Sequence, residues 1–563
     1  MCENELECDC DQVPSLSSTS AGTIEPFADW KKARISANVY DMKQFTRCSS
    51  GTYLRWTGLP FLDVDPIHVK ANCAHNVYLS LHKRYLKNTP EVQRGKLNFK
   101  LLNRIISYLI SQIKERIEPF NAQEWFKEKP GRLRRRYHDA YSRMIKDGVD
   151  LNKISDISAF VKLERYFEDG KAPRMIMGRN PAFTLLYSQV VCPIEKAFFK
   201  LDQCANACDY ISCGEKFSKL VGDWFVENDM SKYEASQRLF TLAMEYTVYR
   251  GVYPDTAILD QLFTTKYYKK GHTTTGVNFS FEGCRGSGDA DTSLGNGILN
   301  YISTMYFLII NTCTADCKID NCGDGCKAKQ FVLKGDDSYM SYPRRETFEN
   351  TYMYFGFEAK LIIRRTPAEV EFCSGHFIEH RPGEYVYVQK LRKLLQSLTT
   401  CINPDAIKNG WVGQYYKSLG LMYSKIYAGI PVYEDIGKFL MSVDCKHGLR
   451  VELIQSYNLI SAFKNFSNGI GSVNRELAAV SVSMVNDMDF AELSGLQTFL
   501  KTHTIHIPPA LNKRMNTVKT RDAIDMSINW ELLNVQFTGR RYSRQEYKIL
   551  LQLRKFACHT LGE

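Results

Sequence analysis

The sequence predicts an α+β protein in which an antiparallel sheet in the middle of the chain lies between two helical regions. Apolar residues recur at three- and four-residue steps from Pro66 to about Lys146, and the pattern is helical again from about Lys390. Between these regions, short β-prone runs end at acidic residues, most clearly in the stretch 331–342. A chain of 563 residues is expected to form several subdomains around more than one core.

The composition is that of a globular protein, with 44% hydrophobic and 24% charged residues. The 73 Lys and Arg residues against 62 Asp and Glu give a net charge of +11, which favours a polyanionic partner if the charge is clustered. The 18 cysteines are scattered behind an acidic, polar N-terminus without a secretory signal, so reduced thiols are expected. No apolar run reaches the roughly 18 residues of a membrane-spanning helix.

Two charged segments stand near the N-terminus. Residues 1–26 carry acids and a Ser/Thr run with no basic residue, which predicts a mobile acidic tail. A dense basic cluster at 127–136 lies beside Trp125 and Tyr137. This cluster is either a solvated surface or part of a groove for a nucleic-acid backbone.

The stretch 331–342 predicts a strand, a tight turn at Gly335 and a second strand. Two adjacent acids, Asp336 and Asp337, then lie at the tip of a hairpin. Such a concentration of negative charge is usually stabilised by a divalent cation, and hard oxygen ligands suit Mg²⁺ or Mn²⁺. The alternative is a plain surface turn, since Gly and Asp favour turns in any protein.

A third acid, Asp229, follows the buried-strand pattern Trp224-Phe-Val. Five residues later Glu234 opens a predicted helix that ends near Gly251. If the strand at 224 pairs with the hairpin strands in an antiparallel sheet, the carboxylates of Asp229, Asp336 and Asp337 converge. Such a cluster could hold two metal ions about 4 Å apart for phosphoryl transfer.

Cations alternate with β-prone residues between 161 and 181, and the flanking prolines discourage helix. Strand alternation places Arg174 on one face and Met175 and Met177 on the other. Five cations could project towards one anionic ligand such as a triphosphate, namely Lys162, Arg165, Lys171, Arg174 and Arg179.

A glycine-rich loop at 283–291 gives way to a helix with an apolar face. Ser287, Thr292 and Asn296 fall on the loop and the first helical turns. Small hydrogen-bonding side chains and free backbone amides in one space suit a sugar and its phosphates. A well-capped glycine loop without a ligand is the alternative.

Four cysteines lie between this helix and the hairpin. Cysteine ligands in a glycine-containing loop could hold a structural Zn²⁺, although the spacings differ from the common two-residue ones. The alternative is a loop of reduced thiols that nearby acids keep soluble. The candidate ligands are Cys313, Cys317, Cys322 and Cys326.

The order of these motifs resembles that of RNA-dependent RNA polymerases of positive-strand RNA viruses. A basic strand, Asp-x₄-acid, Ser-Gly-x₃-Thr-x₃-Asn, Gly-Asp-Asp, Lys360 and Glu371-Phe-Cys-Ser follow one another from about 162 to 375. The stretch 283–296 is most similar to that of the tombusvirus-like group and the wider flavivirus-like supergroup. The resemblance implies a right-hand fold with fingers, an antiparallel palm sheet flanked by helices, and a helical thumb.

The resemblance also implies roles for individual residues. Asp229, Asp336 and Asp337 match the ligands of two Mg²⁺ or Mn²⁺ ions, and Lys360 matches the proton donor to pyrophosphate. Arg174 and Arg179 match cations that contact the nucleotide; Lys171, Lys162 and Arg165 match less closely. Ser287, Thr292 and Asn296 match ribose-selecting positions. Glu234 stands where Asp is usual, and Asp291 where tombusviruses often have Asn.

The implied organisation has four parts. The tail at 1–26 is followed by an N-terminal extension and fingers at 27–222, which include the basic segment 161–181. The palm takes 223–376, with a fingers insertion at 252–282. The thumb takes 377–563.

The implied activity is RNA-directed RNA synthesis that replicates a viral genome, with template RNA, nascent RNA and nucleoside triphosphates as partners. Relatives copy RNA on host membranes, so attachment at a cytoplasmic replication site is expected through another viral replication protein. A reverse transcriptase is disfavoured because it usually has an aromatic residue before its Asp pair and a bulky residue near the sugar. An inactive RNA-binding scaffold is disfavoured by the intact acids.

Overall fold

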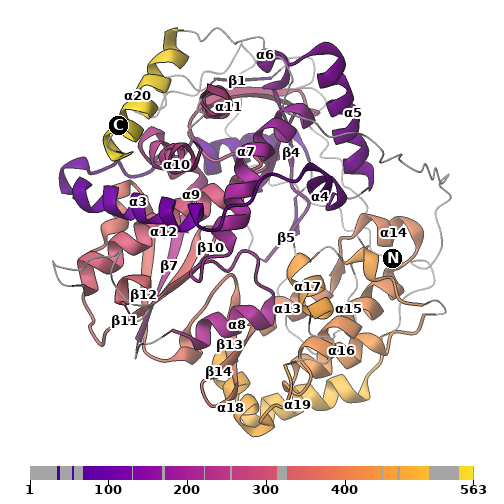
Figure 1. The fold of residues 1–563 in the computed structure, drawn as a ribbon. Helices are drawn as coiled ribbons and strands as arrows, with labels where there is room; N and C mark the ends of the chain where they lie inside the picture. Colours follow the sequence, from indigo (N-terminus) through magenta and orange to yellow (C-terminus); the bar gives the residue numbers. More distant parts are fainter. Residues whose placement is uncertain are drawn as a thin grey trace.

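The computed structural model describes residues 34–37, 54–55, 68–505 and 544–561, apart from 71, 130, 168–170, 221, 223, 254–256, 314–325, 446–447, 455 and 466–469. The predicted tail at 1–26 lies outside these residues, as do Cys317 and Cys322. Helices and sheets are mixed, as the sequence predicts (Figure 1). None of the helices in the described part of the chain is long and apolar enough to cross a membrane.

A four-stranded antiparallel sheet occupies the middle of the chain. Its strand order is β10 (Phe331–Lys334), β11 (Asp337–Tyr342), β7 (Trp224–Ser231) and β12 (Glu358–Arg364). The predicted hairpin is confirmed, and Gly335 adopts a φ of 64°, which a glycine reaches without steric strain. The predicted pairing of the strand at 224 with this hairpin is confirmed as well.

One face of this sheet is covered by helices. Alternate strand residues, among them Val226, Phe331 and Met340, point into a large apolar core. Ile298 and Ile302 of the helix after the glycine loop pack into the same core. The helices that contribute to this core include α12 (Thr292–Thr312), α10 (Leu239–Val252), α3 (Phe99–Lys114) and α7 (Pro181–Phe199).

The other face packs on a second core. Phe225 and Tyr339 meet Phe217 of α8 (Tyr210–Ser218), whose ring stacks 4.0 Å from that of Phe377. Phe377 belongs to a hairpin formed by β13 (Gly375–Arg381) and β14 (Glu384–Gln389). The core continues into the predicted C-terminal helices, α13 (Leu391–Leu398), α14 (Pro404–Asn409), α15 (Val412–Ile426), α16 (Tyr433–Met441), α17 (Tyr457–Asn465), α18 (Arg475–Asn486) and α19 (Phe490–Thr502).

A second sheet joins distant segments. Its order is β1 (Arg34–Ala37), β9 (Val277–Glu282), β8 (Tyr268–Thr273), β4 (Ile157–Val161) and β6 (Met175–Arg179). The pair β4–β8 is parallel and the other three pairs are antiparallel. The predicted insertion at 252–282, which also includes α11 (Ala257–Tyr267), thus packs with the basic segment 161–181. The helix α2 (Ala74–Ser80) contacts β4 and β9 of this sheet, while α5 (Gly131–Asp147) and α6 (Leu151–Ile154) pack on α7, and α4 (Ala122–Lys127) packs on α5.

Two short ladders connect the N-terminal region to the rest of the molecule. β2 (Leu54–Arg55) pairs with β15 (Thr400–Cys401) among the C-terminal helices. β3 (His68–Val69) pairs with β5 (Arg165–Tyr166) in the basic segment. The N-terminal region therefore contacts both the basic segment and the C-terminal helical region.

The last helix, α20 (Arg544–Leu561), differs from the prediction, which places 377–563 in one unit. It packs on α10, where the rings of Phe240 and Phe556 are 5.5 Å apart, and lies far from α15–α19 (Figure 1). Leu553 is fully buried there, and the Arg554 guanidinium donates to the buried Asp260 carboxylate over 2.9 Å. The apolar face of α20 is thus buried against α10, α11 and α3, a location that the sequence pattern of one helix cannot specify.

Candidate active site on the four-stranded sheet

A row of charged residues crosses the four-stranded sheet, with two acids in the middle and a lysine at each end. Lys334 of β10 faces Asp337 of β11, and the pairing of Ser338 with Asn228 brings Asp337 beside Asp229 of β7. Lys360 of β12 lies directly opposite Asp229. Residues opposite one another in adjacent strands share a face, so two carboxylates and two amines line the same side of the sheet.

The third acid, Asp336, lies on the turn of the hairpin and is held there by a residue that the sequence prediction did not include. The Asn300 amide of α12 lies 3.0, 3.1 and 3.2 Å from the carbonyl oxygens of Gly335, Asp336 and Asp337. One side chain therefore fixes the backbone of all three turn residues. A polar residue on the apolar face of a helix, one turn after Asn296, was the available signal.

A buried polar chain extends this anchor to the neighbouring strand. The Asn300 oxygen accepts hydrogen bonds from Ser338 over 3.2 Å and from Thr304 over 2.9 Å. The amide of Asn228 donates to the Ser338 hydroxyl over 3.2 Å. Buried polar groups are costly unless they are paired, so these bonds fix the hairpin relative to both α12 and β7.

The surroundings of Asp336 and Asp337 disfavour the charged form of both carboxyl groups. The surrounding protein displaces bulk water from Asp336, although its side chain stays exposed at the tip of the hairpin. Asp337 and Glu234 add negative charge nearby. Together these effects raise the pKa of Asp336 to about 7. Burial, and then the charge of Asp229, raise the pKa of Asp337, which a hydrogen bond with the Cys373 thiol partly offsets.

The three carboxylates have the donor chemistry that a divalent metal ion needs. Across the residues that the structure describes, no group of three or more His, Cys, Asp and Glu side chains is gathered closely enough to hold an ion. Within the same ranges, no ion pair joins Asp229, Asp336 or Asp337 to a Lys or Arg. Hard carboxylate oxygens whose charge raises each other's pKa fit Mg²⁺ or Mn²⁺, which would neutralise them.

Arg174 of the basic segment faces the acids. The charges of Glu164, Glu234 and Asp336 all act on its guanidinium, which lies 3.6 Å from the Glu164 carboxylate. Lys171 and Arg174 line a cavity of about 730 Å³ that also reaches Lys393 of α13. Arg165 lines this cavity as well, whereas Lys162 lies 3.1 Å from the Glu164 carboxylate. Arg174 is the predicted cation whose charge acts on both Asp336 and Asp337.

Arg179 does not share this orientation. It follows Met175 and Met177 at two-residue steps, so it points to the buried face of β6, and its side chain is only 1% exposed. Its guanidinium donates to the Asp289 carboxylate over 2.8 Å and to the carbonyl of Ser155 over 2.9 Å. The expected projection towards an anionic ligand together with Arg174 is wrong for this residue, because strand alternation separates them.

The predicted glycine loop adjoins this strand. Met177 donates its backbone N–H to the Ser287 carbonyl over 2.7 Å, and a Cβ at Gly288, where φ is 135°, would lie 2.6 Å from the Met177 carbonyl. The Thr292 hydroxyl lies 2.9 Å from the Gly286 carbonyl and closes the loop. The Ser287 hydroxyl is 3.3 Å from that of Tyr85. Thr292 thus has a structural partner inside the loop.

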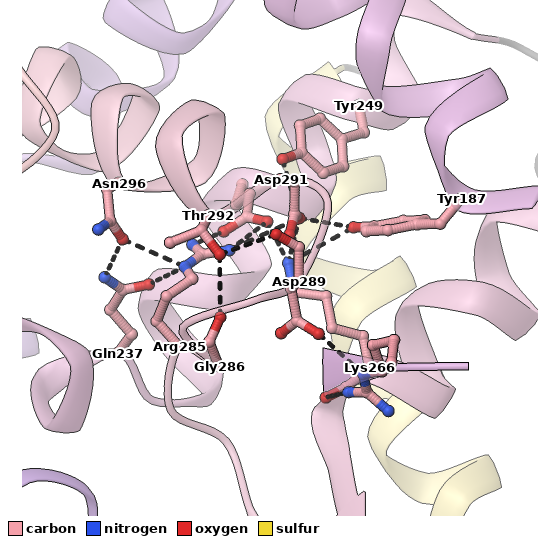
Figure 2. A network of polar contacts seen from close by, with 12 residues as sticks. Tyr187, Gln237, Tyr249, Lys266, Arg285, Gly286, Asp289, Asp291, Thr292 and Asn296 are labelled. Carbon is pink, nitrogen blue, oxygen red and sulfur yellow. Dashed lines mark hydrogen bonds and ion pairs between the residues drawn. The ribbon is translucent and has the colours of Figure 1, made fainter. Parts of the chain in front are cut away.

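A buried charge cluster supports the loop and the start of α12 (Figure 2). Lys266 contacts Glu245 over 2.6 Å and also Asp291, while Arg285 pairs with Glu245. The hydroxyl of Tyr187 donates to Asp291 over 2.7 Å. Asp291 stands at the position where tombusviruses often have Asn. Lys266 and Arg285 both lie beside its Oδ2, and these cations hold its pKa well below the usual range.

The predicted helix from Glu234 to Gly251 is two helices in the structure. A short α9 (Tyr233–Ser236) carries Glu234, and α10 begins at Leu239, because Arg238 between them has an extended backbone. The Glu234 carboxylate lies 3.7 Å from the Arg84 guanidinium. The residue of this segment that contacts Asn296 is not Glu234 but Gln237, which the prediction did not include.

The predicted zinc ligands are described in part. Cys313 and Cys326 are partly buried and belong to no disulfide within the described ranges, and the two cysteines between them lie outside the described residues. The zinc site stays a prediction.

Comparison with known proteins identifies the family. Residues 61–477 match a family described as viral RNA dependent RNA polymerase, and the chain belongs to this family. It is similar to the RNA-directed RNA polymerase of Tomato bushy stunt virus (strain Cherry), with 27% identity over 50% of this chain and 35% of that protein. The corresponding protein of Groundnut rosette virus (strain MC1) is 25% identical over 58% and 39%. The chain thus spans between a third and two fifths of these curated relatives' length.

Proposed function

We propose that the chain carries out template-directed RNA synthesis, adding nucleoside monophosphates to the 3′ end of RNA and releasing pyrophosphate. The observation that carries this proposal is that Asp229 and Asp337 lie side by side on neighbouring strands, with Asp336 on the adjoining turn, where its charge acts on Arg174. Membership of a viral RNA-dependent RNA polymerase family supports it.

In this proposal the molecule has the right-hand polymerase fold, with fingers, palm and thumb. The four-stranded sheet and its helices are the palm (223–376), and the five-stranded sheet belongs to the fingers (27–222 and 252–282). The helices from 391 to 502 are the thumb, and α20 is an addition that packs on α10 of the palm and on α3 and α11 of the fingers. The antiparallel strand order and the cavity between the basic segment and α13 support this assignment.

In the reaction, the 3′-hydroxyl oxygen of the growing RNA forms a bond to the α-phosphorus of the nucleoside triphosphate. The bond from this phosphorus to the oxygen that bridges to the β-phosphate breaks, pyrophosphate leaves with that oxygen, and the hydroxyl proton passes to water. Asp229, Asp336 and Asp337 would hold two Mg²⁺ or Mn²⁺ ions, which when bound favour the ionised hydroxyl and neutralise the developing charge.

The other site residues take positioning and proton-transfer roles in this proposal. Arg174 and Lys171 bind the triphosphate, while Arg179 acts through Asp289 on the glycine loop. Lys360, opposite Asp229 in the sheet, gives a proton to the leaving pyrophosphate. Ser287, Thr292, Asn296 and Glu234 surround the sugar.

The proposal also has partners outside the chain. Template and nascent RNA occupy the space between the basic segment and the C-terminal helices, and nucleoside triphosphates bind beside Arg174. Attachment to host membranes in the cytoplasm comes from another viral replication protein. If the purified chain alone floated with lipid vesicles as efficiently as with the other viral proteins, this last part would be wrong.

The test is single-nucleotide incorporation on an RNA template with Mg²⁺. We expect Asp336→Ala to lose at least about a thousandfold in rate, since an acid that holds the reacting groups is removed. RNA binding should stay within about twofold, because affinity for the RNA backbone depends mainly on cations. Asp147→Ala, an exposed acid at the end of α5, is the matched control and should behave as the unchanged protein.

Undiminished synthesis by Asp336→Ala would contradict the proposal. Efficient use of deoxynucleotides on the RNA template would instead indicate a reverse transcriptase. Tight RNA binding by the unchanged chain without any incorporation would indicate a scaffold.

A further inference from the structure

We propose that Gln237 and Arg285 fix the orientation of the Asn296 side-chain amide, so that Asn296 presents an N–H donor to the sugar of the incoming nucleotide. This inference rests on the proposed polymerase function. It assigns positioning roles to two buried residues, and it states that Asn296 donates the hydrogen bond and that the sugar accepts it.

Arg285 is the fixed point of this arrangement. Its side chain is fully buried, pairs with Glu245 and lies 3.5 Å from Asp291. A Cβ at Gly295 would lie 2.4 Å from the guanidinium, so α12 passes directly over it at a glycine. A guanidinium with two acidic partners and no free space has a single orientation.

The direction of the hydrogen bonds then follows from chemistry. The Arg285 Nε donates to the Gln237 Oε1 over 2.7 Å, and a guanidinium can donate but cannot accept. The amide nitrogen of Gln237 must therefore point the other way, where it donates to the Asn296 Oδ1 over 2.7 Å. The same Nε also lies 3.2 Å from the Asn296 Oδ1. Both neighbours supply protons, so Asn296 must turn its oxygen towards them.

Gln237 and Arg285 both contact the Asn296 oxygen, and the Asn296 nitrogen lies on the side away from Arg285 (Figure 2). Among the described residues, no protein group accepts a hydrogen bond from it, and the residue is partly exposed. Its position is secured by Tyr233, whose hydroxyl donates to the Asn296 carbonyl over 3.1 Å. Asn296 lies one helical turn before Asn300, which holds the backbone of Asp336.

The ligand that such a donor recognises is a 2′-substituent that can accept a hydrogen bond. A 2′-hydroxyl both accepts and donates, a 2′-fluorine can only accept, and a 2′-hydrogen can do neither. An oriented Asn296 nitrogen should favour 2′-fluoro over 2′-deoxy nucleotides of the same base. If the amide were reversed, a 2′-hydroxyl would still bind by donating, but a 2′-fluorine would meet an oxygen.

Gln237→Glu reverses the arrangement with almost no change in shape. A carboxylate accepts from Arg285 and requires a donor from Asn296, so the Asn296 oxygen turns to the sugar. We expect the ratio of kcat/KM for 2′-fluoro over 2′-deoxy nucleotides to fall by about fivefold, the size of one hydrogen bond. The ribonucleotide should lose less than the 2′-fluoro nucleotide. Gln237→Met removes the hydrogen bonds to Arg285 and Asn296 and should give an intermediate ratio. This variant still tests the inference if Gln237→Glu does not fold.

Gln123→Glu in α4 is the matched control, since this glutamine is exposed, and it should leave the ratio unchanged. A purely structural role for Gln237 would lower kcat for all three nucleotides together and keep the ratio, which would overturn the inference. Absence of any incorporation by the unchanged chain would instead overturn the proposed function.

Discussion

Asn300 shows how much the geometry of the site depends on one side chain. Its amide contacts three consecutive carbonyls of the hairpin turn, and its oxygen accepts from Ser338 and Thr304. The turn carries two acids that repel each other, so its backbone needs donors to hold it in place. The buried amide supplies them from the helix behind the sheet.

Asn300→Asp tests this anchor because it changes the chemistry and keeps the shape. Carboxylate oxygens cannot donate, so they would repel the carbonyls of Gly335, Asp336 and Asp337. We expect kcat for nucleotide incorporation to fall at least about tenfold, with KM for the nucleotide changed less, since the reacting geometry is lost. Asn152→Asp in α6, where the side chain is exposed, is the control. Unchanged kcat would show that the turn holds its shape without Asn300.

At this scale the sequence predicts local chemistry and misses tertiary partners. The Asp pair and the positive φ of Gly335 follow from the residues themselves. Arg179 was predicted to face the ligand because the strand contains other cations, yet its two-residue spacing from Met177 turns it inward. The contact of Gln237 with Asn296 joins two motifs far apart in the chain, which no local pattern contains.

The helix α12 connects most of the site. Its first turns carry Thr292 and Asn296, its next turn carries Asn300, and the following residues as far as Leu308 are buried in the main core. The buried charges below its start come from α10, α11 and the glycine loop. Apolar periodicity predicts this helix correctly, but it does not reveal that a guanidinium lies beneath Gly295.

Gly295→Ala tests this close contact. In an open helical position the change would stabilise the protein by up to about 1 kcal/mol, because alanine has the higher helix propensity. At Gly295 the added Cβ would lie 2.4 to 2.6 Å from the Arg285 guanidinium. Overpacking of this kind lowers the free energy of unfolding by about 1–3 kcal/mol, which denaturant titration measures.

Gly495→Ala in α19 is the matched control, since no atom lies within 4 Å of the added Cβ. It should be neutral or stabilising. Equal effects of the two substitutions would show that Arg285 moves aside easily and is not a fixed point.

Across the whole molecule, the order of elements follows the sequence prediction closely. Helices enclose the four-stranded and five-stranded sheets. The strand that carries Asp229 is the neighbour of the hairpin that carries Asp336 and Asp337. The prediction was wrong for α20, which lies on α10 and α3 instead of the C-terminal helices. An amphipathic pattern predicts that a helix buries one face, but several apolar surfaces could accept it.

The central claim is that Asp229 and Asp337, from strands that pair only in the folded molecule, act together in one reaction. Single-turnover incorporation with Mg²⁺ by Asp229→Ala, Asp337→Ala and the double variant tests this most directly. Residues that act as one unit are not additive, so all three variants should fall at least about a thousandfold to the same residual rate. A variant of either aspartate that keeps most of the rate, or a double variant much slower than both single variants, would contradict the claim.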